Sequence, residues 1–227
     1  MDKLYGLIFD VDGVIADTEG PTAEATIQVF EDLFGIKGVK PEDFEAGIGK
    51  GAEAYIKAAA KVHGRELTNE QLAQAEKMRE RNFVRLLQQS PLPAFPGVLE
   101  LMEAALATTD FRLAIATSSS REMSEVALKG AKIPYDRMAY VTGSDVKNKK
   151  PHPEIFLLAA ESMGITPANC VVIEDSPGGV QAARAAGTKC IAVTNTTTPE
   201  NLRDADLVCN SLEQIDLDTI IKLASAE

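Results

Sequence analysis

The sequence predicts an α/β protein with a Rossmann-like, three-layer core and a small helical domain inserted after the first strand. Short apolar runs rich in β-branched residues alternate with segments whose apolar residues recur at helical spacing. Continuous apolar strands of this kind are typical of a parallel sheet covered by helices on both faces. One long stretch interrupts the alternation and is helix-like throughout, which indicates the insertion.

Six apolar runs are the expected strands of the core. They are LYGLIF (4–9), FRLAIAT (111–117), AYVTG (139–143), CVVIED (170–175), KCIAVT (189–194) and ADLVCN (205–210). Helical patterns such as IFLLAAESM (155–163) and VQAARAAG (180–187) lie between them, and Gly187 is expected to end its helix as a C-cap. The strand–helix alternation predicts that neighbouring strands run parallel.

The inserted stretch consists of PTAEATIQVFEDLFG, GAEAYIKAAAKVHG and TNEQLAQAEKMRERNFVRLLQQ. It ends in the proline-rich segment SPLPAFPG (90–97), which is typical of a linker. We therefore expect an α/β core domain of residues 1–17 and 92–227 and a helical domain of residues 18–91.

The charge balance restricts the classes of partner. A net charge of -11 and a pI of about 4.8 argue against binding to nucleic acid or to an anionic membrane, both of which require a basic surface. No apolar stretch approaches the ~20 residues that span a bilayer. We expect a cytoplasmic protein, or an organelle-stroma protein if a transit peptide has been removed. An anionic substrate would have to be held by local cations or a metal.

Two pairs of carboxylates follow expected strands. Asp10 and Asp12 come after the first strand, and Glu174 and Asp175 come after CVVI. Ligand sites in open parallel sheets lie beyond the carboxyl ends of the strands, so the two pairs are expected to converge. Carboxylates without histidine or cysteine form a hard-oxygen set suited to Mg²⁺. Either pair alone would also fit solvated loop acids.

Cationic and hydroxyl groups are expected at the same edge. Thr117 and Ser118 begin a hydroxyl cluster that leads into a helix near Arg121, and Lys150 lies in the loop after AYVTG. A helix N-terminus with hydroxyls binds anions, although the serines would also suit simple N-caps. Together with the carboxylates, these groups predict phosphoryl transfer with a carboxylate nucleophile, a metal and cations that hold a phosphate.

Four segments resemble the four motifs of the haloacid dehalogenase superfamily, in the same order. They are DVDGVIADTE, the hydroxyl at the end of LAIATS, the lysine of KKPHPEIF, and VIEDSPGGVQAARAAG. The helical insert resembles the small helical cap of that superfamily. The overall pattern is similar to the group containing phosphoglycolate phosphatases, β-phosphoglucomutases and CbbY-type sugar phosphatases, and most similar to the CbbY-type members.

The resemblance implies a role for each motif residue. Asp10 would be the nucleophile that forms an aspartyl-phosphate, and Asp12 the general acid and then the base that activates water. Thr117, or less directly Ser118, would bind the transferring phosphoryl group, and Lys150 would offset charge between that group and Asp10. The Mg²⁺ ligands would be the carboxylates of Asp10, Glu174 and Asp175 and the backbone carbonyl of Asp12.

The cap is expected to select the substrate. Lys50 and Arg79 fall where relatives place substrate-binding residues, although both would also suit solvated helix cations. Mutase relatives carry a histidine about ten residues after the acid/base aspartate, and here that position is Thr22. We therefore expect a monomeric Mg²⁺-dependent phosphatase acting on a sugar phosphate, a sugar bisphosphate such as xylulose 1,5-bisphosphate, or a phosphoglycolate-like metabolite. A β-phosphoglucomutase-type phosphomutase is the alternative.

Overall fold

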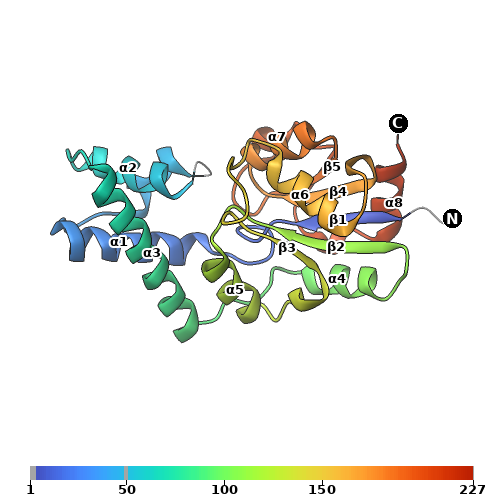
Figure 1. The fold of residues 1–227 in the computed structure, drawn as a ribbon, viewed down its shortest axis with the longest axis horizontal. Coiled ribbons are helices and arrows are strands. Elements are labelled where there is room, and N and C mark those ends of the chain that lie inside the picture. The colour runs from blue at the N-terminus through green and yellow to red at the C-terminus, as the bar shows by residue number, and fades with distance from the viewer. Residues whose placement is uncertain (1–3, 49–50, 227) are drawn as a thin grey trace.

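The computed structural model describes residues 4–48 and 51–226 of the chain. Its core is a six-stranded, all-parallel sheet in the order β3-β2-β1-β4-β5-β6 (Figure 1). The strands are β1 (Tyr5–Phe9), β2 (Phe111–Ala116), β3 (Ala139–Val141), β4 (Cys170–Glu174), β5 (Lys189–Val193) and β6 (Leu207–Cys209). All six expected strands are present, and the predicted fold class is confirmed.

The register of the central strand positions the candidate site. Phe9, the last residue of β1, pairs with Ile115 of β2 on one side and with Ile173 of β4 on the other. Asp10, which follows Phe9, is therefore level with Ala116 and Glu174, the last residues of β2 and β4. Because the strand order reverses around β1, this point is where open α/β sheets form a crevice.

Helices cover both faces of the sheet, as the continuous apolar strands predict. One face carries α4 (Val98–Leu106), α5 (Arg121–Gly130) and α8 (Leu217–Ser225), and the other carries α6 (Glu154–Met163) and α7 (Pro177–Ala186). Phe9 belongs to the same apolar cluster as Leu101 and Leu128, whereas its neighbour Ile8 belongs to the cluster of Phe156 and Ala183. Successive strand residues thus face opposite layers.

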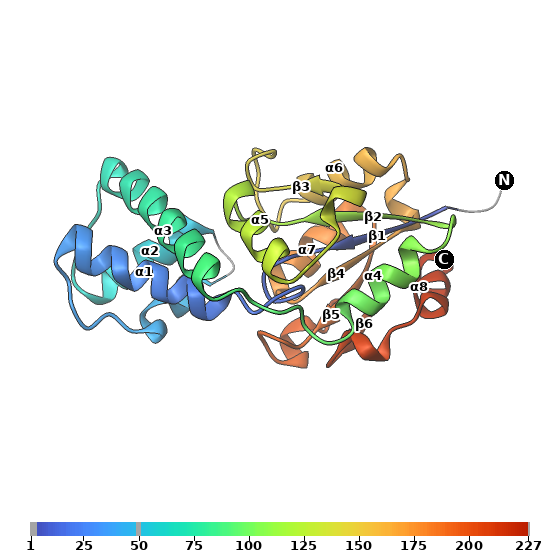
Figure 2. The same ribbon diagram turned by 90° about the horizontal axis from the view of Figure 1, so that it is seen from below.

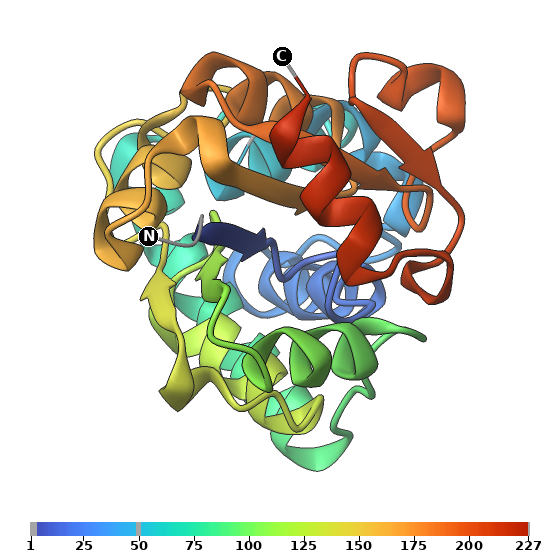
Figure 3. The same cartoon turned by 90° about the vertical axis from the view of Figure 1, so that its right-hand side faces the viewer.

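The described residues of the insertion form the α-helices α1 (Glu19–Phe34), α2 (Ala52–Val62) and α3 (Asn69–Gln89). Figures 1 and 2 show them as a separate lobe beyond the carboxyl ends of the strands, and Figure 3 shows them behind the sheet when it is seen from the opposite end. This lobe has its own apolar cluster, which includes Phe30 and Phe44. We call the lobe the cap.

The cap and the core also share side chains. Phe83 and Leu87 of α3 and Ala25 of α1 belong to the core cluster and not to that of the cap. The two connecting segments touch where the backbone N–H of Phe95 donates to the carbonyl of Ile15 at 2.8 Å. Because of these shared contacts, the boundaries at residues 17 and 92 stay a prediction.

Short 3₁₀ turns complete the chain at Pro41–Gly47, Tyr135–Arg137, Pro167–Asn169, Pro199–Leu202 and Leu212–Gln214. Among the described residues, no helix combines the length and apolar character needed to cross a membrane.

Candidate active site

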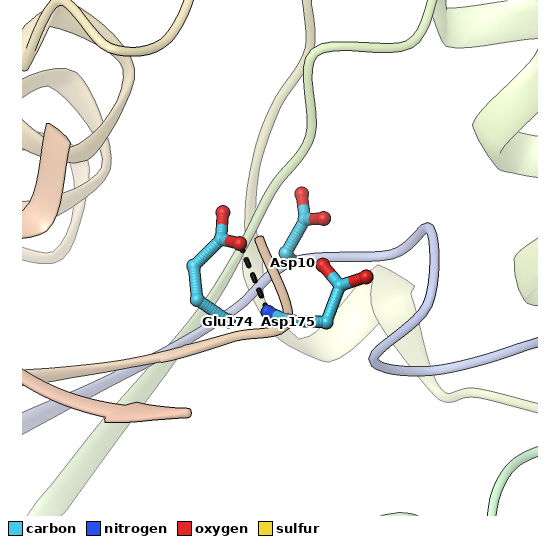
Figure 4. Close-up of side chains that lie close together, drawn as sticks. All are labelled: Asp10, Glu174 and Asp175. Atoms are coloured by element: carbon cyan, nitrogen blue, oxygen red, sulfur yellow. Dashed lines mark hydrogen bonds between the residues drawn. The ribbon is translucent and has the colours of Figure 1, made fainter. Parts of the chain in front are cut away.

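Three carboxylates meet at the carboxyl ends of β1 and β4. Asp10 follows β1 directly, Glu174 ends β4 and Asp175 comes next in the chain. Each offers an oxygen, and these oxygens lie within 4.8 Å of one another (Figure 4). All three side chains are buried, and that of Glu174 is fully inaccessible. Closely spaced carboxylate oxygens of this kind are the donor set that hard divalent cations prefer.

Lys150 connects two of these carboxylates. Its Nζ donates to Oδ1 of Asp10 at 2.8 Å and to Oε1 of Glu174. The ammonium also lies 5.0 Å from the centre of the Phe156 ring, on the first turn of α6. The loop before α6 thus delivers a buried cation to the acid cluster from a position 140 residues away from Asp10 in the sequence.

The cluster carries more negative charge than Lys150 neutralises. Burial raises the pKa of Asp10 to about 8; Lys150 opposes this rise, while Glu174 and Asp12 add to it. Burial, followed by the charges of Glu174 and Asp10, likewise raises the pKa of Asp175 well above its usual range. Burial alone would lower the pKa of Lys150, but its two ion pairs outweigh burial and raise it. A divalent cation would relieve this excess charge.

Two glycines leave room for the acids. A Cβ at Gly13, whose φ is +75°, would lie 2.0 Å from Oδ2 of Asp175, and a Cβ at Gly179 would lie 1.8 Å from Cδ of Glu174. Oε2 of Glu174 accepts from the backbone N–H groups of Asp175 and Ser176 at 3.0 and 3.2 Å and from the Ser176 hydroxyl at 3.0 Å. The backbone around the cluster is therefore shaped to hold these carboxylates, and the residues present fit a divalent metal.

Asp12 points to a different environment from that of Asp10. Its Oδ1 accepts from the Thr18 hydroxyl at 2.7 Å, and its Oδ2 accepts from the hydroxyls of Thr117 and Ser119 at 3.1 and 2.7 Å. The carboxylate is not part of the three-acid cluster. Three hydroxyls thus fix the orientation of Asp12 beside the cluster, and any contact of this residue with the metal would be through its backbone.

A cavity of about 530 Å³ lies between these groups and the cap. Its core side includes Asp10, Asp12, Lys150 and Asp175, together with Ser118, Ser119 and Ser120. Its cap side includes Glu19, Thr22, Tyr55, Glu76, Lys77, Arg79 and Glu80. The volume is that of a small-molecule site.

A family model described as haloacid dehalogenase-like hydrolase matches residues 7–193. The chain is also 32% identical over 213 residues to hexitol phosphatase A of Escherichia coli, covering 94% of each protein. The chain belongs to the haloacid dehalogenase-like hydrolase family. The resemblance found in the four sequence motifs is thereby confirmed, and the protein is an enzyme of that family.

Solved structures of the family share the whole architecture. The structure of CbbY from Rhodobacter sphaeroides in complex with xylulose 1,5-bisphosphate has a TM-score of 0.83 and 26% identity, covering 96% of this chain and 99% of that one. A β-phosphoglucomutase from Clostridium difficile has a TM-score of 0.82 at 24% identity, covering 97% of each chain, and shows the same fold.

Another relative is much longer than this chain. Protein SUPPRESSOR OF QUENCHING 1 of Arabidopsis thaliana, a chloroplastic protein, is 33% identical over 208 residues. The match covers 89% of this chain and 19% of that protein, so the chain corresponds to about a fifth of its length.

The hydroxyls expected to bind phosphate differ in their access to the cavity. The Thr117 side chain is buried; its hydroxyl donates to Asp12 and accepts from the Ser119 N–H at 3.0 Å. Ser118 lines the cavity, and Thr117 is not among the residues that line it. Of the two expected residues, Ser118 is therefore the one directly open to a ligand.

Of the two cap residues expected to bind substrate, the structure describes Arg79. Lys50 lies outside the described residues. Arg79 lines the cavity, where Nη2 lies 3.8 Å from Sδ of Met123 and the buried Nε has no hydrogen-bond partner. Burial lowers the pKa of this guanidinium, and the carboxylates of Asp12, Glu76 and Glu80 oppose that effect. A ligand oxygen would satisfy the unpaired N–H.

Several residues of the site carry no role in the sequence-based prediction. Thr196, after β5, donates to Oδ2 of Asp175, and the Asn195 amide donates to the carbonyl of Gly13 at 2.8 Å. Both follow β5, so the expectation that ligand sites lie beyond the carboxyl ends of parallel strands also applies to them. Thr18 lies inside the first motif, and its contact with Asp12 depends on the backbone path between them. Glu19, like Thr18, lies inside the first motif. The cap residues Tyr55 and Glu80 had no sequence signal that separates them from ordinary helix residues.

Proposed function

We propose that the protein is a Mg²⁺-dependent phosphatase that hydrolyses a small phosphorylated metabolite through an aspartyl-phosphate on Asp10. The observation that carries this proposal is the contact of Lys150 with Asp10 and Glu174 inside a buried cluster of three acids. Such an arrangement lets a carboxylate approach a phosphate, because the negative charges of both groups are offset locally.

Asp10 is the nucleophile in this mechanism. Its carboxylate oxygen attacks phosphorus, the bond from phosphorus to the ester oxygen breaks, and the leaving group departs as an alcohol after protonation. Lys150 favours the charged form of Asp10 and orients one of its oxygens. Asp10, Glu174, Asp175 and the backbone carbonyl of Asp12 would hold Mg²⁺, which when bound neutralises charge on the phosphate and on the attacking carboxylate.

Asp12 transfers the proton. It protonates the leaving alkoxide and then takes a proton from the water that attacks the aspartyl-phosphate. The hydroxyls of Thr18, Thr117 and Ser119 orient it for both steps. The cap covers the cavity and limits access of bulk water during the first step.

The phosphoryl oxygens are bound just beyond the carboxyl end of β2. Ser118 lines the cavity, and the residues after it lead into the N-terminus of α5, whose N-cap is Ser120. Thr117 contributes its hydroxyl if the phosphate competes with Asp12 for it. Free N–H groups and hydroxyls in this position favour an anion.

The substrates of the relatives suggest the substrate range. Hexitol phosphatase A and the CbbY complex with xylulose 1,5-bisphosphate both point to phosphorylated sugars or polyols. We therefore propose a sugar phosphate, a sugar bisphosphate or a phosphoglycolate-like compound, with Arg79 binding the leaving group. Lys50 remains a second candidate for that role. A monomer located in the cytoplasm or an organelle stroma is the associated expectation.

A phosphomutase is the alternative, and Thr22 argues against it. This residue lines the cavity at the position where mutase relatives carry a histidine, and it offers no titratable group. Hydrolysis needs no retention of the product for a second transfer. We therefore favour the phosphatase.

A phosphate-release screen tests the proposal. Purified protein with Mg²⁺ is assayed against sugar monophosphates, sugar bisphosphates and phosphoglycolate, with EDTA-treated protein as the control. Release that depends on Mg²⁺ supports the phosphatase. Conversion of glucose 1-phosphate to the 6-phosphate without phosphate release would support the mutase, and activity that persists in EDTA would contradict the metal assignment.

A further inference from the structure

The cap side of the cavity is rich in acids. Among the described residues, it carries the carboxylates of Glu19, Glu76 and Glu80 against the cations Lys77 and Arg79. Lys77 is exposed, as is Lys149 on the core side of the cavity, so both charges are largely solvated. Arg79, the other cation of the cap side among the described residues, interacts with the charges of Asp12, Glu76 and Glu80. The described residues on the cap side of the cavity therefore carry no excess of positive charge.

An acid of the cap lies next to the start of α5. Ser120 caps this ten-residue helix: its Oγ accepts from the Met123 N–H at 3.4 Å and donates to Oε1 of Glu80. Glu80 belongs to α3 of the cap, so its carboxylate reaches across to the helix N-terminus of the core. A second phosphate placed on the cap side of this position would lie beside the Glu80 carboxylate.

The same residues suit hydroxyl groups well. Carboxylates accept hydrogen bonds from hydroxyls, and the buried Nε of Arg79, which lacks a partner, donates to an oxygen. Tyr55 also lines the cavity. Burial and the charge of Glu19 raise the pKa of its hydroxyl to about 12, and the charge of Arg79 opposes this rise. It therefore stays protonated and can donate. Acceptors and donors together match an uncharged polyhydroxylated group.

We propose that the enzyme selects phosphate monoesters whose leaving group is an uncharged sugar or polyol, and that Glu80 and Glu76 disfavour a second phosphate. This inference rests on the proposed phosphatase function and narrows its substrate range. A phosphate dianion beside two carboxylates meets like-charge repulsion, which interfaces use to suppress wrong partners. Hydroxyls meet no such repulsion and satisfy the acceptors that the cap presents.

The test compares matched substrates. We measure kcat/KM by phosphate release for fructose 1-phosphate against fructose 1,6-bisphosphate, and for xylulose 5-phosphate against xylulose 1,5-bisphosphate. We expect each monophosphate to be preferred by about tenfold or more, which corresponds to about 1.4 kcal/mol of discrimination. A wild-type enzyme that hydrolyses the bisphosphates as well as or better than the monophosphates would overturn the inference.

Variants assign the selectivity to the cap acids. Glu80→Gln keeps an oxygen that can accept from Ser120 and removes the charge, so the ratio of bisphosphate to monophosphate kcat/KM should rise by about tenfold. Glu76→Gln should move the ratio in the same direction, which covers the case of a poorly folded Glu80 variant. Glu70→Gln, an exposed acid on the same helix and outside the cavity lining, is the matched control and should leave the ratio unchanged.

The outcomes separate this inference from the proposed function. Failure to release phosphate from any ester in the presence of Mg²⁺ would contradict the phosphatase, and the inference would fall with it. Release without a preference for monophosphates would leave the phosphatase intact and overturn the inference alone. An unchanged ratio in both Glu80→Gln and Glu76→Gln would overturn the role of the cap acids.

Discussion

In the proposed mechanism Asp10 must be ionised to attack phosphorus, yet it lies where burial raises its pKa to about 8. Lys150 counters this effect only in part, because it is shared with Glu174. A bound cation would supply the remaining stabilisation. Under the proposed function, the same residues therefore link three properties: ionisation of the nucleophile, metal binding and stability.

This link predicts a pH-dependent effect of Mg²⁺ on stability. The carboxyls of Asp10 and Asp175 have raised pKa values in the folded protein. Their contribution to stability is complete below the unfolded pKa of about 4 and is lost as pH rises through the folded values. The metal-free protein should therefore lose stability toward pH 8. The increase in Tm caused by saturating Mg²⁺ should be larger at pH 8 than at pH 5.5.

Thermal unfolding with EDTA and with Mg²⁺ across this pH range measures the effect. Carboxyls with lowered pKa values, such as those of Asp43 and Asp216, are fully ionised above pH 5.5 and cancel in the difference. In Asp10→Asn the pH dependence of the difference should be shallower, because one titrating carboxyl is gone. A Mg²⁺ shift that is constant or falls with pH would contradict the account of the cluster.

At the scale of elements, ligand sites in open parallel sheets lie beyond the carboxyl ends of the strands, and this explains why much of the site can be predicted from the sequence. Asp10 follows β1, Glu174 ends β4 and Lys150 lies in the loop after β3, so the fold class alone brings them to the carboxyl ends of the parallel strands. The hydroxyl contacts of Asp12 depend on rotamers and loop paths that no periodic pattern encodes. The role of Glu80 also could not be predicted from the sequence, because its contact with Ser120 at the start of α5 exists only when α3 packs against α5.

The start of α7 provides a prediction at this scale. Replacing Gly179 by alanine would place a Cβ 1.8 Å from Cδ of Glu174, so the carboxylate would have to move. We expect apparent Mg²⁺ affinity to fall by about 10- to 100-fold, as for changes to groups that orient metal ligands. A Mg²⁺ titration followed by thermal shift checks this.

The matched control is Gly20→Ala in the first turn of α1. A Cβ there would have no neighbour within 4 Å. Alanine is a better helix former than glycine by up to about 1 kcal/mol, so stability should be equal or higher and Mg²⁺ affinity unchanged. Equal Mg²⁺ affinities for the two variants would refute the packing argument at Gly179.

At the scale of the whole molecule, the cap is joined to the core through buried side chains and is not merely tethered. The helical nature of residues 18–91 could be read from composition and spacing. The packing of the cap against the core could not be predicted from the sequence, because Phe83 is part of the same amphipathic pattern as residues that face the cap interior. Its placement in the core cluster is a result of tertiary packing.

A substitution among the side chains that join the cap to the core should therefore destabilise the protein as a whole. Phe83 is 1% exposed, and Phe83→Ala should lower the free energy of unfolding by about 3–5 kcal/mol in urea denaturation. Phe34→Ala is the control: Phe34 is only partly buried against the cap cluster, so its loss should cost less. A larger cost for Phe34→Ala would contradict this description of how the cap joins the core.

The central claim is that Asp10 becomes phosphorylated during turnover. Rapid acid quench of the Mg²⁺-loaded enzyme with a substrate from the screen, followed by mass spectrometry of the peptide that contains Asp10, tests it directly. We predict one added phosphoryl group on Asp10 at early times, and neither label nor turnover in a folded Asp10→Asn variant. A phosphoryl group on another residue, or an active Asp10→Asn enzyme, would contradict the account.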